Sequence, residues 1–424
     1  MKVLVIGSGG REHAIIRKLK ENPTIGEIIC APGNGGIAAD AKCVSVSAID
    51  LANMVELAKN EKVDFCVVTP DDPLAMGMVD ILEMEGIPCF GPNANAAIIE
   101  SSKVFAKNLM KKYQIPTAGY AVFSDAQEAI NYIRTQNRYP TVLKADGLAL
   151  GKGVLIAQTE EEAVQAVNEL MVDQAFGQAG KQIVIEEFMT GPEVSVLAFT
   201  DGHVVVPMVS SMDHKRALDN DEGLNTGGMG TIAPSPFYTK EIADTCMKTI
   251  FMPTVEAMKQ EGRLFKGCLY FGLMLTPEGP RVVEYNCRFG DPETQVVLPL
   301  LKTDLLTIMR AVHDEKLSEL TIEWEDKACA CVILASGGYP QKYHKGYEID
   351  GLDDYGQVEG VTIYHAGTAW KDGKYYTNGG RVLGVSAVGD TLEEALQLSY
   401  EKIKEIQFTD MHYRTDIGRK VVKQ

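Results

Sequence analysis

Short apolar runs alternate with amphipathic stretches over the first hundred residues. Apolar runs with the length of buried strands occur at residues 2–6, 27–30, 63–69 and 87–90. Stretches with helical spacing lie between them, at residues 12–22, 50–60 and 74–85. Strands and helices that alternate in this way form a parallel sheet with helices on both faces. We therefore predict a doubly wound α/β domain over residues 1–102.

The pattern changes near residue 102, where longer strands and glycine-rich loops begin. The helices and strands expected in this second region lie at residues 103–113, 139–153, 182–188, 193–210 and 240–260. Such a mixture is typical of an α+β fold. We predict a central α+β domain over residues 103–325, with a flap subdomain at about 120–190.

The last hundred residues again combine strands with a helix. Strand-like runs occur at residues 328–335, 361–365 and 381–388, and a helical stretch follows at 392–406. This order predicts a small C-terminal α/β domain over residues 326–424.

Length, charge and cysteine content narrow the class of protein. A chain of 424 residues is too long for one hydrophobic core, which agrees with several domains. The net charge of −17 repels polyanions, so we expect no nucleic-acid partner. The longest apolar stretches, such as residues 328–335, are too short to span a bilayer, and a strand at residue 2 leaves no signal peptide. Nine cysteines without a C-x-x-C pair suit free thiols, so we expect a cytoplasmic protein.

The first predicted strand ends in a glycine-rich loop at residues 7–13. A dinucleotide-binding fold would need a third glycine where Glu12 stands, and an acid after the second strand, which is absent. We therefore expect no NAD. The backbone amides of Gly9 and Gly10 would still cradle a phosphate at the start of a helix, with Arg11 beside them. A tight turn without a ligand is the alternative.

A second glycine loop follows Lys144, at the end of another predicted strand. It fails the Walker template, because the spacing from Gly147 to Gly151 is one residue too short and Gly153 replaces Ser or Thr. A strand lysine followed by a glycine hairpin with Lys152 instead suits a flap that closes over the phosphates of ATP. A surface hairpin without a ligand is the alternative.

Residues 284–295 carry the densest group of polar side chains. Alternate residues of a strand point to one face, so Glu284 and Asn286 would lie together. Their oxygens suit a hard divalent cation that is shared with substrate phosphates. Arg288 lies two residues after Asn286, so its side chain would point to the same face. There it would stabilise an anionic intermediate. An ion-pair network at the end of a strand is the alternative.

Two acids, Glu186 and Glu187, end a further predicted strand, and Glu193 follows shortly afterwards. A strand edge can bind adenine through its backbone, and a nearby carboxylate can hold the hydroxyls of ribose. Acids that are simply solvated are the alternative. Three histidines lack the spacing of metal ligands with one another. We therefore assign no catalytic role to His13, His214 or His365.

Together these segments resemble the ATP-grasp ligases and, within them, the glycinamide ribonucleotide synthetase (phosphoribosylamine–glycine ligase) family. The resemblance covers nearly the whole chain. It rests on GSGGREH from Gly7, APGN from Ala31, SK at Ser102, KADGLALGKG from Lys144, IEEF from Ile185, DHKR from Asp213, NTGGMG from Asn225, EYNCRFGDPETQ from Glu284, HAGT from His365 and TNGGRV from Thr377. The segments outside the central domain distinguish this family from other ATP-grasp enzymes.

The resemblance implies an ATP-grasp fold for the central domain and ligation of glycine to 5-phosphoribosylamine in purine biosynthesis. The glycine carboxylate would attack the γ-phosphate of ATP, and the amine would capture the resulting glycyl phosphate. Such catalysis consists mainly of positioning and charge neutralisation. Mg²⁺ or Mn²⁺ would be the metal, the partners would be small molecules, and we expect a monomer.

The resemblance also implies a role for individual residues. ATP would be bound by Lys103, Lys144, Lys152, Glu186, Phe188 and Glu193, with Phe188 acting through its backbone. Glycine and phosphoribosylamine would be bound by Gly9, Gly10, Arg11, Asn34, Asp71, Asp213, Asp291, Pro292, Glu293 and Thr294. The metal ligands would be Glu284 and Asn286. The catalytic residues would be Arg288, Asp213 and Lys152.

The chain departs from the family pattern at Asp71, where a glutamate one methylene longer is usual. Two other functions remain open. Another ATP-grasp enzyme, such as a carboxylase component or a phosphoribosyl carboxy-ligase, would hydrolyse ATP with bicarbonate and without glycine. An ATP-binding regulatory subunit would bind ATP without turnover.

Overall fold

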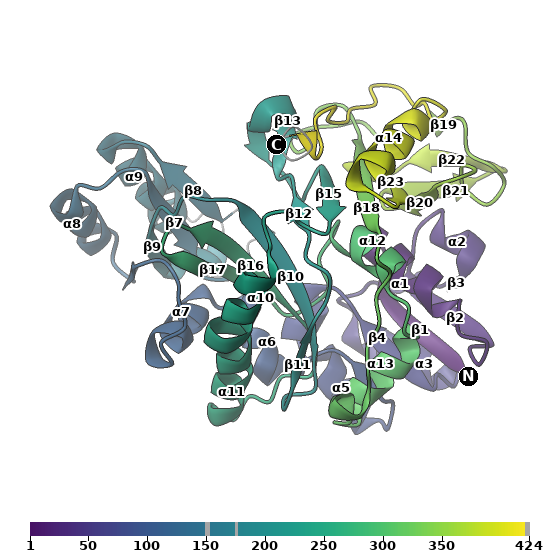
Figure 1. The fold of residues 1–424 in the computed structure, drawn as a ribbon, viewed down its shortest axis with the longest axis horizontal. Coiled ribbons are helices and arrows are strands. Elements are labelled where there is room, and N and C mark those ends of the chain that lie inside the picture. Colours follow the sequence, from purple (N-terminus) through teal and green to yellow (C-terminus); the bar gives the residue numbers. More distant parts are fainter. Residues whose placement is uncertain (149–152, 174–176, 420–424) are drawn as a thin grey trace.

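The N-terminal domain is built on a parallel sheet with the strand order β3-β2-β1-β4-β5 (Figure 1). The computed structural model describes residues 1–148, 153–173 and 177–419. The strands are β1 (Lys2–Gly7), β2 (Glu27–Pro32), β3 (Lys42–Cys43), β4 (Phe65–Val68) and β5 (Cys89–Phe90). The surrounding helices are α1 (Gly10–Leu19), α2 (Ile37–Asp40), α3 (Leu51–Asn60), α4 (Asp71–Ala75), α5 (Met78–Met84) and α6 (Ala94–Ser101). The central strands are apolar and buried because helices cover both faces, which confirms the predicted doubly wound fold.

The prediction of a single helix over residues 74–85 is wrong. The structure has two helices there, α4 and α5, and Gly77 separates them with a φ of 89°. Few residues other than glycine adopt this left-handed conformation, and it interrupts the hydrogen bonding of a helix. The break leaves Asp71 at the first position of a short helix.

The flap region forms an antiparallel sheet with the order β6-β9-β7-β8. Its strands are β6 (Tyr120–Phe123), β7 (Thr141–Ala145), β8 (Val154–Ala157) and β9 (Ile183–Glu187), and its helices are α8 (Ala126–Gln136) and α9 (Glu160–Val167). Side chains from both helices and from β7, β8 and β9 share a hydrophobic cluster of their own. This region forms the left end of the molecule in Figure 1.

The second sheet of the central domain has the order β11-β10-β16-β17. Its strands are β10 (Glu193–Thr200), β11 (Val205–Pro207), β16 (Gly267–Thr276) and β17 (Gly279–Asn286). The helices beside it are α7 (Lys103–Lys112), α10 (Lys240–Cys246) and α11 (Met252–Gln260), and a π-helical turn, Met247–Phe251, joins the last two. The mixed α/β content of this region agrees with the predicted α+β domain.

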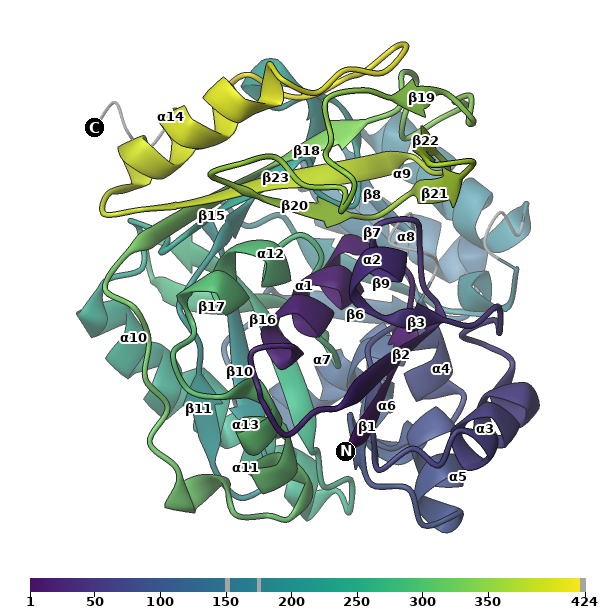
Figure 2. The ribbon, with the colours of Figure 1, turned by 90° about the vertical axis from the view of Figure 1, so that its right-hand side faces the viewer.

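A third sheet combines strands from the central and C-terminal regions in the order β12-β15-β18-β23-β20. Its strands are β12 (Met212–Asp213), β15 (Gly230–Ala233), β18 (Ala328–Ala335), β20 (Thr362–His365) and β23 (Arg381–Gly389). The sheet therefore takes strands from both sides of the domain boundary expected at residue 325. Figure 2 shows β20 and β23 lying over α1 and α2 of the N-terminal domain.

The remaining strands and α-helices are short, except for α13 and α14, which have 9 and 12 residues. They are β13 (Arg216–Leu218), β14 (Glu222–Asn225), α12 (Thr294–Val297), α13 (Leu305–His313), β19 (Glu348–Ile349), β21 (Thr368–Lys371), β22 (Lys374–Thr377) and α14 (Leu392–Ile403). Within the described ranges, no helix is long and apolar enough to cross a membrane.

Candidate active site

The glycine-rich loop after β1 lies against the segment that follows β17. The backbone N–H of Arg11 donates to Asp291 Oδ2 at 3.4 Å, although 280 residues separate the two. Gly9 and Gly10 stand at the start of α1, where the N–H of Gly9 donates to Glu12 Oε2 at 2.5 Å. The loop predicted to cradle a phosphate thus borders the turn predicted to bind glycine.

Asn34 anchors the loop after β2. Its Nδ2 donates to the carbonyl oxygens of Ser8 at 2.9 Å and His365 at 2.8 Å. Its Oδ1 accepts from the N–H groups of Gly36 at 3.0 Å and Ile37 at 2.9 Å. The amide of Asn34 is therefore used within the protein, and a ligand at this loop would meet backbone groups instead.

Strand β17 places Glu284 and Asn286 on one face, and the tyrosine between them is buried. Burial favours a higher pKa for Glu284, but nearby lysines, Lys215 foremost, lower this pKa below its ordinary value. The carboxylate is therefore ionised. Among the described residues, no group of three or more His, Cys, Asp or Glu could hold a metal. One carboxylate and one amide oxygen fit Mg²⁺, which keeps bound waters and takes further oxygens from phosphates.

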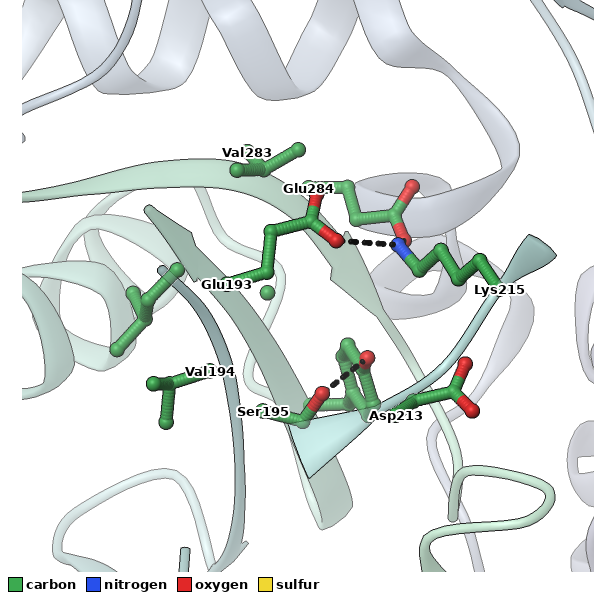
Figure 3. A pocket seen from close by; sticks show the side chains of 10 residues that line it. Glu193, Val194, Ser195, Asp213, Lys215, Val283 and Glu284 are labelled. Atoms are coloured by element: carbon green, nitrogen blue, oxygen red, sulfur yellow. Dashed lines mark hydrogen bonds and ion pairs between the residues drawn. The ribbon is translucent and has the colours of Figure 1, made fainter. Parts of the chain in front are cut away.

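Lys215 lies among these residues, although no role was predicted for it. Its Nζ lies 3.6 Å from Glu193 Oε2 and 3.8 Å from Glu284 Oε1. Figure 3 shows its side chain reaching these two carboxylates while the carboxylate of Asp213 points away from them. Glu193 and then Glu284 raise the pKa of Lys215 well above its ordinary value, so it stays charged. Its spacing of two residues from Asp213 is the signal that could have found it.

Three lysines, Lys103, Lys107 and Lys144, form a group that we name the lysine cluster. Glu186 is buried between two of them, 3.1 Å from Lys107 Nζ and 3.0 Å from Lys144 Nζ. The third, Lys103, donates to the carbonyl of Gly147 at 2.6 Å. Burial lowers the pKa of Lys107 to about 8 and also lowers the pKa of Lys103. The carboxylate of Glu186 is thus engaged with two of the lysines, and Lys103 adds a third cation to the group.

The other residues predicted to bind ATP lie at strand ends. Phe188 directly follows β9 and is half-buried. Glu193 begins β10, and its carboxylate pairs with Lys215 at 3.6 Å. Lys152 lies outside the described residues.

Arg288 follows β17 and forms an ion pair with Glu100 at 3.0 Å. Glu100 also accepts the N–H of Cys287 at 2.7 Å. Burial opposes the charge of Arg288, but Glu100 and then Asp71 raise its pKa above the ordinary value. Arg288 is therefore charged, and Asp71 contributes to its field from the N-terminal domain. Glu100 was not predicted, because nothing in its helix marks it.

Asp213 and Glu293 form a second charged group, which we name the carboxylate pair. Burial and then the charge of Glu293 raise the pKa of Asp213 well above its ordinary value. Burial also raises the pKa of Glu293, whose Oε1 accepts from the hydroxyl of Tyr270 at 3.2 Å. Two crowded carboxylates, half-buried Asp213 and buried Glu293, would be relieved by a ligand with a positive charge.

Arg381 reaches this part of the site from β23. Its guanidinium donates to the carbonyl oxygens of Asp291 at 2.8 Å and Gly227 at 2.7 Å. A further nitrogen lies 3.6 Å from Asp291 Oδ1. Arg381 thus joins the C-terminal region to two glycine-rich segments of the central domain. Arg381 belongs to the TNGGRV motif that supports the family resemblance, but no role was predicted for it.

The turn after Asp291 is closely packed. A Cβ at Gly228 would lie only 2.5 Å from Pro292 Cδ. The hydroxyl of Thr294 donates to the carbonyl of Gly290 at 2.5 Å. Pro292 and Thr294 therefore shape the turn that carries Glu293 between them.

The three histidines considered are buried and hydrogen-bonded. His13 Nε2 lies 2.9 Å from Asp40 Oδ2, and His13 Nδ1 accepts the backbone N–H of His365 at 2.8 Å. His214 Nδ1 lies 3.0 Å from the carbonyl of Gly230. These contacts agree with structural roles.

Models of a known protein family match the chain in three consecutive segments. Models of the N, ATP-grasp (A) and C domains of phosphoribosylglycinamide synthetase match residues 1–100, 101–294 and 329–420. The chain belongs to the phosphoribosylglycinamide synthetase family. Family membership confirms the resemblance seen in the motifs and the ATP-grasp fold of the central region.

Relatives of the phosphoribosylglycinamide synthetase family align along the whole chain. A phosphoribosylamine–glycine ligase of Caldanaerobacter subterraneus subsp. tengcongensis is 48% identical, with 99% of each chain aligned. The trifunctional purine biosynthetic protein adenosine-3 of Gallus gallus is also 48% identical, over 99% of this chain and 42% of that protein. The solved phosphoribosylamine–glycine ligase of Thermotoga maritima has a TM-score of 0.85 at 34% identity, covering 98% of this chain and 100% of that one.

Proposed function

We propose that this chain ligates glycine to 5-phosphoribosylamine in the de novo synthesis of purines. The products are glycinamide ribonucleotide, ADP and phosphate, and the intermediate is glycyl phosphate. Support comes from relatives named phosphoribosylamine–glycine ligase that align over the full chain at 48% and 45% identity. Further support comes from three parts of the site: the lysine cluster, the carboxylate pair and the glycine-rich loop at the start of α1.

The ATP end is the lysine cluster. Lys103 and Lys144 contact the phosphates of ATP, together with Lys152, which lies outside the described residues. Buried Glu186 holds Lys144 in place, since its carboxylate is 3.0 Å from that ammonium. The backbone at Phe188 binds adenine at the strand edge, and Glu193 binds the ribose.

Glu284 and Asn286 hold Mg²⁺ or Mn²⁺ through two oxygens on one strand face. The metal, when bound, neutralises charge on the phosphates of ATP. Lys215 and Arg288 contribute fixed positive charge near Glu284. Fixed charges of this kind stabilise the anionic acyl phosphate without reorganisation during the reaction.

Glycine lies with its ammonium at the carboxylate pair, Asp213 and Glu293. This orientation leaves the glycine carboxylate free to attack the γ-phosphate. Asp291, Pro292 and Thr294 form the turn that supports the pocket. Because the carboxylate pair is partly buried and crowded, an ammonium ligand gains more there than it would at an exposed acid.

Phosphoribosylamine lies at the N-terminal domain. Gly9, Gly10 and Arg11 receive its phosphate at the start of α1, where the helix dipole favours anions. In the free protein Glu12 and Asp291 accept the N–H groups of Gly9 and Arg11. The loop held by Asn34 borders this place. Asp71 contacts the ribose, close to Arg288.

One observation carries the proposal most strongly: the contact between Arg11 and Asp291, at 3.4 Å. It joins the phosphate-binding loop of one domain to the glycine-binding turn of another.

The test is phosphate release from ATP, with glycine and phosphoribosylamine added singly and together. Phosphoribosylamine is formed in place from ribose 5-phosphate and ammonia. We expect release that requires both substrates. Release with bicarbonate and without glycine would contradict the proposal and favour a carboxylase-type reaction. ATP binding without release under any condition would favour a regulatory subunit.

We further propose that the chain works as a monomer in the cytoplasm with small-molecule substrates alone. Sedimentation of the purified protein at assay concentration tests the first of these points, and a dimer would contradict it.

A further inference from the structure

The hairpin that follows Lys215 is a small sheet of its own. Within the described ranges, β13 and β14 pair only with each other, and every residue of β14 is exposed. An isolated two-stranded hairpin is at best marginally stable in water. Yet this hairpin begins directly after Lys215, whose ammonium lies among the carboxylates of the site. Contacts from elsewhere must therefore hold it.

Residues 412–418, which we name the C-terminal strap, supply such contacts. The N–H of Thr415 donates to Asp219 Oδ1 at 2.8 Å. The N–H of Asn220 donates in return to Asp416 Oδ2 at 2.8 Å. Strap and hairpin lie side by side at the top of Figure 1, where β13 stands next to the yellow end of the chain. Nearly 200 residues of sequence separate the two, as the offset of 196 between Asn220 and Asp416 shows.

Arg414 is the centre of the strap. It is among the largest fully buried side chains, with 1% of its surface exposed. Asp416 holds its guanidinium through two bonds of 2.7 and 2.9 Å. The same guanidinium donates to the carbonyl of Arg216 at 3.1 Å and pairs with Asp221 at 3.0 Å. A planar guanidinium held on several sides fixes the position of its partners, and an ammonium cannot replace it.

The strap also contacts His214, the residue directly before Lys215. The N–H of Gly418 donates to His214 Nε2 at 3.1 Å. Burial, with Arg414 next in effect, lowers the pKa of His214 to about 4, so its ring is neutral and Nε2 can accept. His214 Nδ1 then donates to the carbonyl of Gly230 at 3.0 Å. The strap therefore holds the backbone on both sides of Lys215.

We propose that Arg414 is a positioning residue for the ligase reaction, since it holds the backbone at Arg216 and so places the ammonium of Lys215 beside Glu193 and Glu284. The inference rests on the proposed function and adds to it a role for the C-terminal strap. Arg414 touches no substrate and acts through Lys215. Its effect belongs to the chemical step, because Lys215 faces the metal ligand Glu284 and not the N-terminal glycine loop.

A double-mutant cycle tests this role. Arg414→Met, Lys215→Met and the double variant are compared with wild type by phosphate release with both substrates. We expect Arg414→Met to lower kcat by roughly 10- to 100-fold, as small displacements of catalytic groups do. The KM for phosphoribosylamine should change little. In the Lys215→Met protein, the same substitution should lower kcat by no more than about 2-fold, because both changes remove one function.

Arg414→Lys keeps the charge without the planar fork, so it should fall between wild type and Arg414→Met. It also serves if Arg414→Met does not fold. Arg134→Met is the matched control. Arg134 is an exposed arginine of the flap, paired with Glu160 at 2.9 Å, and its loss should leave kcat unchanged.

A second readout does not depend on ligase activity. Glu222 is exposed on β14, so cleavage there by a glutamate-specific protease reports opening of the hairpin. Cleavage should be faster in Arg414→Met than in wild type and Arg134→Met. An inactive wild-type enzyme would refute the proposed function, while cleavage would still test the strap. Additive losses of kcat in the cycle, or equal cleavage of Arg414→Met and wild type, would overturn the inference.

Discussion

The two ends of the site differ in the sign of their excess charge. At one end, two lysines of the lysine cluster pair with one buried carboxylate, and burial lowers the pKa of Lys103 and Lys107. At the other end, burial raises the pKa of Asp213 and Glu293. Each end therefore holds like charges that the free protein only partly compensates.

Under the proposed function, this difference orients the substrates. ATP would bring negative charge to the lysine cluster, and the ammonium of glycine would bring positive charge to the carboxylate pair. The glycine carboxylate is then directed toward the middle of the site, where Glu284, Asn286 and Arg288 lie. Electrostatic complementarity along the site thus places the two reacting groups together before any bond changes.

Loss of the metal ligand between the two ends should have the largest effect. Glu284→Ala removes the only carboxylate of the proposed metal site, so kcat should fall by roughly 10³-fold or more. Phosphate release measures the loss. Glu278→Ala, an exposed acid near the turn before the same strand, is the control and should behave as wild type. Unchanged turnover in Glu284→Ala would contradict the metal assignment.

Removing one charge from the carboxylate pair should impair the use of glycine and leave the use of ATP nearly unchanged. Asp213→Asn should lower kcat/KM for glycine by about 10²-fold, the scale for truncating a buried charge pair. The KM for ATP should stay near the wild-type value, since the lysine cluster is untouched. Kinetics with each substrate varied in turn measure the effect. Equal losses for ATP and glycine would mean that the two ends do not act separately.

The lysine end has a corresponding variant. Lys152→Ala should weaken the use of ATP by roughly 10²-fold through loss of one charge on the transferred phosphoryl group. The KM for glycine should change less than that for ATP. Wild-type kinetics in this variant would remove Lys152 from the site.

The smallest expected effect is on stability. The raised pKa of Asp213 means that, above its ordinary value of 3.8, the folded protein binds more protons than the unfolded chain. Stability from this group therefore decreases as pH rises through that window. Asp213→Asn should melt at a higher temperature than wild type at pH 7, and the difference should shrink toward pH 4. Thermal melts at both pH values test this. A lower Tm of the variant at pH 7 would contradict the destabilising repulsion between Asp213 and Glu293.

Local pattern predicted the parts of this molecule that depend on neighbouring residues. The alternation of a strand was enough to place Glu284 and Asn286 on one face, and the apolar runs were enough to predict the parallel sheet. The helix expected over residues 74–85 failed because one glycine, Gly77, takes a left-handed conformation that hydrophobic spacing does not reveal.

Long-range contacts could not be predicted in the same way. Arg381 acts on Asp291 across 90 residues, and Arg414 acts on Arg216 across 198. The pairing of β15 with β18, which joins the central and C-terminal regions in one sheet, is likewise invisible in either segment alone. Burial of Glu186 between two lysines depends on how helix α7 packs on the flap sheet. Such features follow from tertiary packing, which single-chain patterns do not encode.

The most direct test of the polarised site compares glycine with glycolate, which has the same carboxylate but no ammonium. Phosphate release from ATP with phosphoribosylamine present gives kcat/KM for each. The account predicts that wild type prefers glycine by about 10²-fold or more, and that Asp213→Asn loses most of this preference. Equal use of glycine and glycolate by the wild-type enzyme would contradict a carboxylate pair that binds the ammonium.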